Sequence, residues 1–185
     1  MINKTKTVKK FKDRDWQIEA FKIIDRCNCS NKLEVIPINA CVGSGKTNVA
    51  AYALGSFINT NKGKKTIQVF VTPRIKLCAQ QAKEIPEFIE RKFGLINSKD
   101  YDIIRKDCTQ HELNLSNEDF TSKHAIIVIC DESLWGTDNN ATDPEKRWHS
   151  WIKFFEKRDK DGYVVGNVIF DESHNFTDNY EYIGV

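Results

Sequence analysis

The stretch from residue 40 to residue 47 constrains the fold more than any other part of the chain. Its residues are, in order, Ala40, Cys41, Val42, Gly43, Ser44, Gly45, Lys46 and Thr47. A short apolar run, residues 35–39, precedes it, and an apolar stripe with helical spacing follows it. Small residues between a strand and a helix let the backbone wrap a phosphate with its N–H groups pointing inward, and the helix N-terminus adds a favourable dipole. The sequence therefore predicts a phosphate-binding strand–loop–helix unit.

Two side chains of this stretch suit a nucleotide and its metal ion. Lys46 can reach the β- and γ-phosphates, and the Thr47 hydroxyl can ligate Mg²⁺. Ala40 departs from the general pattern G-x-x-x-x-G-K-[ST], because it stands where that pattern has its first glycine. The alternative is a Gly-Ser-Gly turn that precedes Lys-Thr by chance. The strand–loop–helix context favours the phosphate loop.

Two Asp-Glu-Ser triplets each follow an apolar run: residues 131–133 and residues 171–173. A phosphate loop that serves hydrolysis needs a carboxylate at a strand end to hold Mg²⁺, and a neighbouring carboxylate to orient the attacking water. We favour Asp171 and Glu172, because residues 164–170 form a good buried strand. His174 adds a side chain that can exchange hydrogen-bond partners near the γ-phosphate. We interpret Asp131 and Glu132 as a solvated strand end.

Strand-like and helix-like segments alternate along the chain, which predicts an α/β fold with a mostly parallel sheet flanked by helices. Helices are expected after a cap at Asp13, after residue 47, over residues 75–89 with a kink or restart at Pro86, and over residues 145–157. Strands are expected over residues 35–39, 66–72, 101–104, 125–130 and 164–170. Pro37 costs the first of these strands one ladder hydrogen bond.

The order of the motifs resembles the first RecA-like domain of superfamily 2 helicases. Residues 40–47 fit motif I of that family, in which alanine is common at the first position, so Ala40 agrees with the family. Residues 171–174, Asp-Glu-Ser-His, are similar to motif II in its D-E-x-H form.

Two weaker segments accompany these motifs. Residues 14–17, Arg-Asp-Trp-Gln, look like the R-x-x-Q segment in which the glutamine reads adenine. Residues 72–74, Thr-Pro-Arg, with Leu77 and Gln80 following, are similar to motif Ia, which holds a nucleic-acid backbone phosphate. Taken alone, the glutamine could be an exposed helix residue, and the arginine could be a surface charge at a helix start.

The resemblance implies a role for each residue of these motifs. It places Lys46, Asp171, Glu172 and His174 in catalysis. It places Arg14, Gln17, Ala40, Gly43, Ser44, Gly45, Lys46 and Thr47 in ATP binding. It places Thr47 and Asp171 in Mg²⁺ ligation, and Thr72, Pro73 and Arg74 in contact with nucleic acid.

The resemblance covers residues 11–174. We therefore expect residues 11–185 to form a first RecA-like domain, incomplete at its C-terminal end, and residues 1–10 to form a flexible segment. Motif III does not appear after motif II, and the motifs of a second RecA-like domain do not appear either. In RecA-like sheets the motif III strand lies between the strands of motifs I and II, so we expect a gap there. A fragment or a split protein is favoured over closure through residues 175–185.

Composition adds weaker constraints. The net charge of +2 is too mild to indicate a partner. No apolar run approaches the roughly 18 residues that span a membrane, and the first residues do not resemble a secretory signal, so we expect an intracellular, cytoplasmic protein. The six cysteines contain no CxxC pair, which predicts reduced thiols without zinc. The abundance of Lys, Asn and Ile is typical of an AT-rich genome and leaves a viral or phage origin open.

Together these features predict the ATP-binding half of a nucleic-acid-dependent ATPase, a helicase or translocase that uses ATP and Mg²⁺. A second RecA-like domain or a partner chain would be needed for efficient hydrolysis and for movement on DNA or RNA, with DNA favoured and with contacts to the backbone. The isolated chain is expected to be weak or inactive as an ATPase.

The alternative is a truncated or degenerate helicase domain that binds protein or nucleic acid without turnover. In that alternative an aromatic stripe would be the interface, although such a stripe could also simply be part of the core. Its residues are Trp135, Trp148, Trp151, Phe154 and Phe155. A kinase or GTPase is disfavoured by the D-E-x-H and Thr-Pro-Arg segments, and a GTPase also by the lack of an N-K-x-D guanine reader in the sequence.

Overall fold

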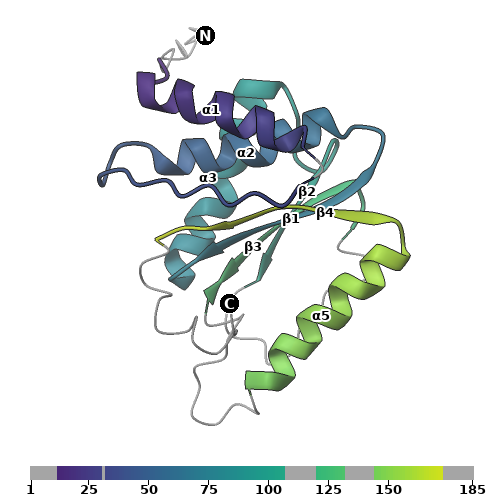
Figure 1. The fold of residues 1–185 in the computed structure, drawn as a ribbon. Coiled ribbons are helices and arrows are strands. Elements are labelled where there is room, and N and C mark those ends of the chain that lie inside the picture. The colour runs from purple at the N-terminus through teal and green to yellow at the C-terminus, as the bar shows by residue number, and fades with distance from the viewer. Residues whose placement is uncertain (1–11, 31, 107–119, 132–143, 173–185) are drawn as a thin grey trace, which may run out of the picture.

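The computed structural model describes residues 12–30, 32–106, 120–131 and 144–172 (Figure 1). Its elements are, in chain order, α1 (Asp15–Asn28), α2 (Lys46–Thr60), β1 (Lys65–Thr72), α3 (Ile75–Phe93), β2 (Asp102–Lys106), β3 (His124–Cys130), α5 (Pro144–Lys160) and β4 (Tyr163–Phe170). Within these ranges, none of the helices combines the length and the apolar character needed to cross a membrane.

The four strands form one sheet in the order β2-β3-β1-β4, and every neighbouring pair is parallel. Thr72 at the end of β1 lies opposite Cys130 at the end of β3, and Val71 lies opposite Phe170 at the end of β4. Because the strands are parallel, the segments that follow β1, β3 and β4 leave the sheet at the same edge. The predicted α/β class with a parallel sheet and flanking helices is confirmed.

Helices cover both faces of the sheet: α1, α2 and α3 lie on one side and α5 on the other (Figure 1). Side chains of β1 alternate between the two layers, because successive strand residues point to opposite faces. Phe70 packs in the core beneath α1, α2 and α3, whereas Val69 and Val71 pack in the core with Trp151 of α5. The apolar run of this strand is therefore explained by burial on both faces.

The aromatic side chains of α5 contribute to the core of the second layer. Trp151 is 1% exposed, and its ring lies 5.6 Å from the ring of Phe155 and 5.9 Å from that of Phe154. This part of the aromatic stripe is core and not an exposed interface. Trp135 and the side chain of Trp148 lie outside the described part of the chain.

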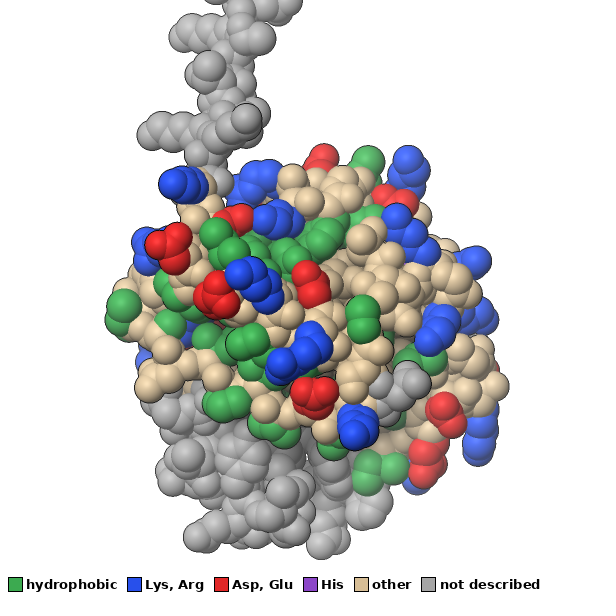
Figure 2. All heavy atoms as spheres, turned by 45° about the horizontal axis from the view of Figure 1, so that its top comes forward, with side chains coloured by type: hydrophobic (Ala, Val, Ile, Leu, Met, Phe, Trp, Pro, Cys, Tyr) green, Lys and Arg blue, Asp and Glu red, His purple; other side chains and the backbone are tan. Residues whose placement is uncertain are grey.

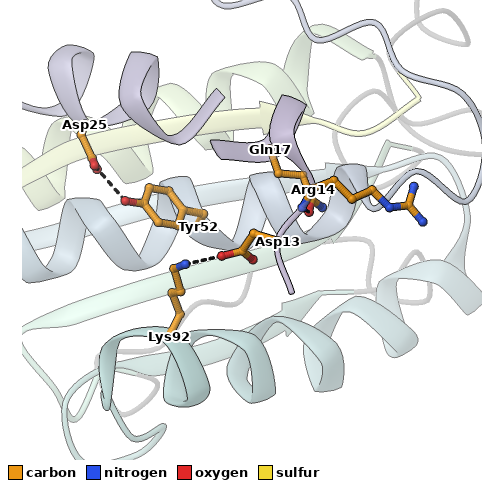
Figure 3. A network of polar contacts seen from close by, with 6 residues as sticks. All are labelled: Asp13, Arg14, Gln17, Asp25, Tyr52 and Lys92. Carbon is orange, nitrogen blue, oxygen red and sulfur yellow. Dashed lines mark hydrogen bonds and ion pairs between the residues drawn. The ribbon is translucent and has the colours of Figure 1, made fainter. Parts of the chain in front are cut away.

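Polar contacts fasten α1 and the residues just before it to α2 and α3 (Figure 3). On one side, Asp25 accepts hydrogen bonds from the hydroxyls of Tyr52 at 2.8 Å and Ser56 at 2.6 Å, both on α2. Burial and the neighbouring Asp25 raise the pKa of Tyr52, so its hydroxyl keeps the proton that it donates. On the other side, Asp13 forms an ion pair of 2.6 Å with Lys92 near the end of α3.

The predicted cap at Asp13 is wrong, because Arg14 is the N-cap of α1. The backbone N–H of Arg14 donates to the side-chain Oε1 of Gln17 at 2.9 Å, which satisfies an N–H at the helix start. The helix predicted to kink or restart at Pro86 is one continuous element, α3, with this proline inside it.

The predicted strand over residues 35–39 is also wrong. Residues 33–40 have no regular secondary structure, and Leu33 and Val35 are 97% and 88% exposed. A strand is stabilised by its ladder hydrogen bonds, and no described strand pairs with this segment. Pro37 removes one donor in addition. On the face that Figure 2 turns forward, apolar side chains lie at the surface among basic and acidic ones.

β4 is an outer strand of the described sheet, and it is apolar on both of its faces. Val164 is 43% exposed and Val165 is 44% exposed, although all seven residues of β3 are buried. Because neighbouring strand residues point to opposite faces, apolar side chains are partly exposed on both faces at the start of this strand, whereas Gly166 further along lies against the ring of Phe57 on α2. The sequence predicted a gap between a strand over residues 35–39 and the strand of the acidic pair, and because the described residues have no strand at 35–39 that gap stays a prediction.

Candidate functional site

The phosphate loop and the acidic pair meet at the edge of the sheet where β1 and β4 end. The backbone N–H of Asp171 donates to the carbonyl oxygen of Val71 at 2.9 Å, so the pairing of β4 with β1 continues one residue past the strand. The Nζ atom of Lys46, in the first turn of α2, lies 3.5 Å from the Oε1 atom of Glu172. Residues far apart in the sequence are thus brought into one site.

Two glycines give the phosphate loop its shape. Gly43 and Gly45 have φ angles of 71° and 90°, which glycine adopts far more readily than other residues. A Cβ atom at Gly45, the N-cap of α2, would lie 2.6 Å from Nε2 of Gln17. The Ser44 backbone N–H donates to the carbonyl oxygen of Cys41 at 3.2 Å and closes the turn. The loop therefore depends on glycine both for its backbone and for the close approach of Gln17.

Gln17 connects the start of α1 to the phosphate loop, and Figure 3 shows it beside Arg14. Its Nε2 donates to the carbonyl oxygen of Gly45 at 3.1 Å, and its Oε1 accepts from the backbone of Arg14. The side chain is 4% exposed, which excludes the interpretation of Gln17 as an exposed helix residue. The Arg14 side chain, by contrast, is exposed. Because both ends of the Gln17 amide are engaged, this side chain braces the loop.

Glu172 is held in a strained backbone conformation. Its φ angle is 53°, in the left-handed region, where a residue other than glycine costs roughly 1–3 kcal/mol. Such strain persists only where the surroundings impose it, and it is concentrated at functional sites. The side chains of Lys46 and Glu172 are 27% and 30% exposed, so their charges face each other in a partly shielded position.

Asp171 lies in an environment that would favour a bound cation. Burial, and after it the charge of Glu172, raise the pKa of the Asp171 carboxyl, while Lys46 acts in the opposite direction. A carboxylate that is costly to ionise is stabilised by a metal ion beside it. The carboxylate of Asp171 and the hydroxyl of Thr47 are oxygen donors of the kind that Mg²⁺ prefers. The described residues contain no cluster of three metal-binding side chains, so phosphates and water would complete the shell.

Gln81 is a residue of this site that the sequence did not identify. It is 4% exposed, and its Nε2 lies 3.5 Å from Oγ1 of Thr47. The motif resemblance pointed instead to Gln80, which is exposed. The helical phase could have distinguished the two glutamines, because Gln81 follows the buried Cys78 by three residues and precedes the buried Ile85 by four.

The remaining predicted residues lie at the same edge or outside the described residues. Thr72 is fully buried at the end of β1, whereas Arg74, the N-cap of α3, is exposed, with the half-buried Pro73 between them. Asp131 follows β3 and is half-buried. His174 lies outside the described residues. Contact between Arg74 and nucleic acid stays a prediction.

Comparison with known families places the chain in a defined class. Residues 10–184 match the family described as type III restriction enzyme, res subunit. The chain belongs to this family, which has a helicase-like ATP-binding domain of superfamily 2. The resemblance drawn from the motifs is confirmed at this level, and the D-E-x-H subtype stays a prediction. Searches of the curated proteins and of the solved structures found no match.

Replacing Asp171 by asparagine is expected to stabilise the chain in the absence of nucleotide. Burial raises the pKa of this carboxyl above its ordinary value of 3.8, so its ionisation costs free energy in the folded state. The cost is absent at pH values well below 3.8, where the group is protonated in both states, and is fully present above the raised pKa. In urea titrations, Asp171→Asn should therefore unfold at a higher midpoint than the wild type at neutral pH.

The difference between the two midpoints should shrink as the pH is lowered through the raised pKa. The control is Asp159→Asn, at an exposed position of α5, which should unfold at nearly the same midpoint as the wild type at neutral pH. A midpoint for Asp171→Asn equal to or below that of the wild type at neutral pH would contradict the interpretation.

Proposed function

We propose that this chain is the ATP-binding half of a nucleic-acid-dependent ATPase, a helicase or translocase. The observation that carries the proposal is the contact between Lys46 at the start of α2 and Glu172 beyond β4. A lysine at a helix start behind a glycine loop, facing an acidic pair at a strand end, provides the parts of a phosphoryl-transfer site. Membership of a family with a helicase-like ATP-binding domain supports the same conclusion.

In this proposal the phosphates of ATP lie in the loop of residues 40–47. The backbone N–H groups of the loop, the N-terminus of α2 and the ammonium group of Lys46 would all favour negative charge there. Mg²⁺ is held by Thr47 and Asp171, and its charge offsets the cost of the partly buried Asp171 carboxylate. The start of α1, with Arg14 and Gln17, lies beside the loop. We assign adenine binding to this side of the site.

Phosphate binding changes the partner of Lys46. In the structure this lysine neutralises Glu172, and an anionic phosphate would compete for the same ammonium group. Once Lys46 contacts the phosphate, the Glu172 carboxylate can orient the attacking water and accept its proton. Bound Mg²⁺ supplies neutralisation of the charge that develops on the phosphoryl oxygens. His174 is proposed to act near the γ-phosphate, as the D-E-x-H pattern implies.

Arg74 is the residue that we propose meets the nucleic acid, DNA or RNA, with DNA favoured. It is exposed at the N-terminus of α3, where its charge and the helix dipole together favour a backbone phosphate. Such contacts carry no sequence information, so we expect binding that does not depend on base sequence.

The open edge of β4 supports the proposal that another part of the motor completes this domain. Val164, Val165 and Val168 are 43–49% exposed, and β4 is an outer strand of the sheet that the described residues form, a position at which a further strand can be added. We propose that a second RecA-like domain, in the same polypeptide or in a partner chain, lies beyond this edge. That domain would supply arginine side chains, which contribute about 10³–10⁵ in rate in related phosphoryl transfers.

Replacing Lys46 by alanine tests the nucleotide site directly. Isothermal titration of the wild-type chain with ATP and Mg²⁺ should show binding. Lys46→Ala should weaken binding at least about tenfold, since hydrogen bonds to charged groups contribute roughly 1.5–3 kcal/mol. Lys64→Ala, at an exposed position before β1, is the matched control and should bind ATP as the wild type does.

Each outcome of this titration separates the candidate functions. Unchanged affinity in Lys46→Ala would contradict the site. No binding by the wild type would favour the alternative, a helicase-like domain that acts as a binding module. Efficient hydrolysis by the chain alone, measured as phosphate release, would contradict the need for a second domain.

Replacing Arg74 by alanine is expected to weaken binding to single-stranded DNA or RNA, because one phosphate contact is lost. The slope of log K against log salt should become less negative by about 0.7, the value for one contact with a single strand. Fluorescence anisotropy at several salt concentrations measures both effects. Lys83→Ala, at an exposed position on the same helix, is the control. Identical affinity and slope in Arg74→Ala would exclude this contact.

A further inference from the structure

One polar atom beside the phosphate loop is buried without a hydrogen-bond partner among the described residues: Oε1 of Gln81. The other end of the same amide, Nε2, lies 3.5 Å from Oγ1 of Thr47. The whole side chain is 4% exposed, so water has little access to it. The great majority of buried acceptors in proteins have a hydrogen-bond partner, so a buried acceptor without one calls for an explanation.

The chemistry of a hydroxyl ligand provides that explanation. When the Thr47 hydroxyl binds a cation, an oxygen lone pair points to the metal, and the hydroxyl must donate its proton elsewhere. An amide side chain has a donor end and an acceptor end. In the structure Nε2 donates to the hydroxyl oxygen, and a rotation of the amide would present Oε1 as acceptor for the hydroxyl proton.

We propose that Gln81 is a positioning residue for the metal ion of this site. With the cation bound, its Oε1 accepts the proton of the Thr47 hydroxyl and holds the oxygen lone pair toward Mg²⁺. The inference rests on the proposed ATP site and adds to it a group that acts through Thr47. Outer-shell partners of this kind fix the orientation of a metal ligand.

The position of Gln81 on α3 gives the contact a second consequence. α3 begins at Ile75, directly after Arg74, and Gln81 lies about 10 Å further along the helix at roughly 1.5 Å per residue. One rigid element thus carries the exposed arginine at its start and the buried glutamine against Thr47. A shift of α3 on nucleic-acid binding would therefore also move the amide that orients the metal ligand.

The test is the Mg²⁺ dependence of nucleotide binding, measured with the full chain. ATP binding is titrated first in EDTA and then at increasing Mg²⁺, in the wild type, Gln81→Met, Gln81→Glu and Gln80→Met. Methionine keeps the approximate size but neither end of the amide, and glutamate keeps an acceptor. Gln80→Met is the matched control at the exposed neighbouring position. A thermal unfolding curve for each variant shows that it is folded.

We expect Gln81→Met to require on the order of 10- to 100-fold more Mg²⁺ than the wild type for the same enhancement of binding over its own affinity in EDTA. Gln81→Glu should require less Mg²⁺ than Gln81→Met, because its carboxylate can accept the Thr47 proton. Gln80→Met should match the wild type. A purely structural role for Gln81 would instead lower the unfolding temperature and leave the Mg²⁺ dependence as it was.

The failures of the two proposals are distinguishable. A wild type that binds ATP with a normal Mg²⁺ enhancement, together with an equal enhancement in Gln81→Met, would overturn the role of Gln81 alone. A Gln81→Glu variant that is folded and as impaired as Gln81→Met would overturn the acceptor role. A wild type that binds no ATP under either condition would overturn the proposed function, and the role of Gln81 with it.

Discussion

The parallel pairing of β1 with β4 is the constraint on which the site depends. It sets the ends of both strands at one edge of the sheet, with Val71 opposite Phe170. The hydrogen bond of 2.9 Å from the Asp171 backbone to Val71 then fixes the first acidic residue beyond the strand. Glu172 follows at once and faces Lys46. Without this pairing, the acidic pair would have no fixed position relative to the phosphate loop.

Several groups of the site are held in states that a ligand would relieve. Burial raises the pKa of the Asp171 carboxyl, the backbone of Glu172 is strained at a φ angle of 53°, and the hydroxyl of Ser44 is buried without a partner among the described residues. Each of these features costs stability in the absence of ligand. A bound cation would offset the first, and a phosphate could satisfy the third. The folded chain is therefore less stable without a ligand, and binding of the cation and the phosphate would recover that stability.

The sequence predicted the parallel α/β fold, the strand of the acidic pair and the helix after the phosphate loop, because each shows a strong periodic pattern or a turn with its own chemistry. The sequence-based predictions were wrong at positions where contacts with other elements determine the structure. Residues 35–39 have a strand-like composition, but a strand forms only where a neighbour pairs with it. Asp13 has the chemistry of a cap but instead pairs with Lys92 across the fold. Gln81 was missed because the motif resemblance points to the adjacent Gln80, whereas only the helical phase indicates that Gln81 faces the core.

A crystal structure of the chain with Mg²⁺ and a non-hydrolysable ATP analogue would test the central claim most directly. We predict phosphates in the loop of residues 40–47, with the Nζ atom of Lys46 on a phosphate oxygen and moved away from Glu172, its partner at 3.5 Å in the structure described above. Thr47 and Asp171 should face the ion. A nucleotide bound elsewhere, or a loop without phosphate beside an intact pair of Lys46 and Glu172, would contradict the assignment of this site.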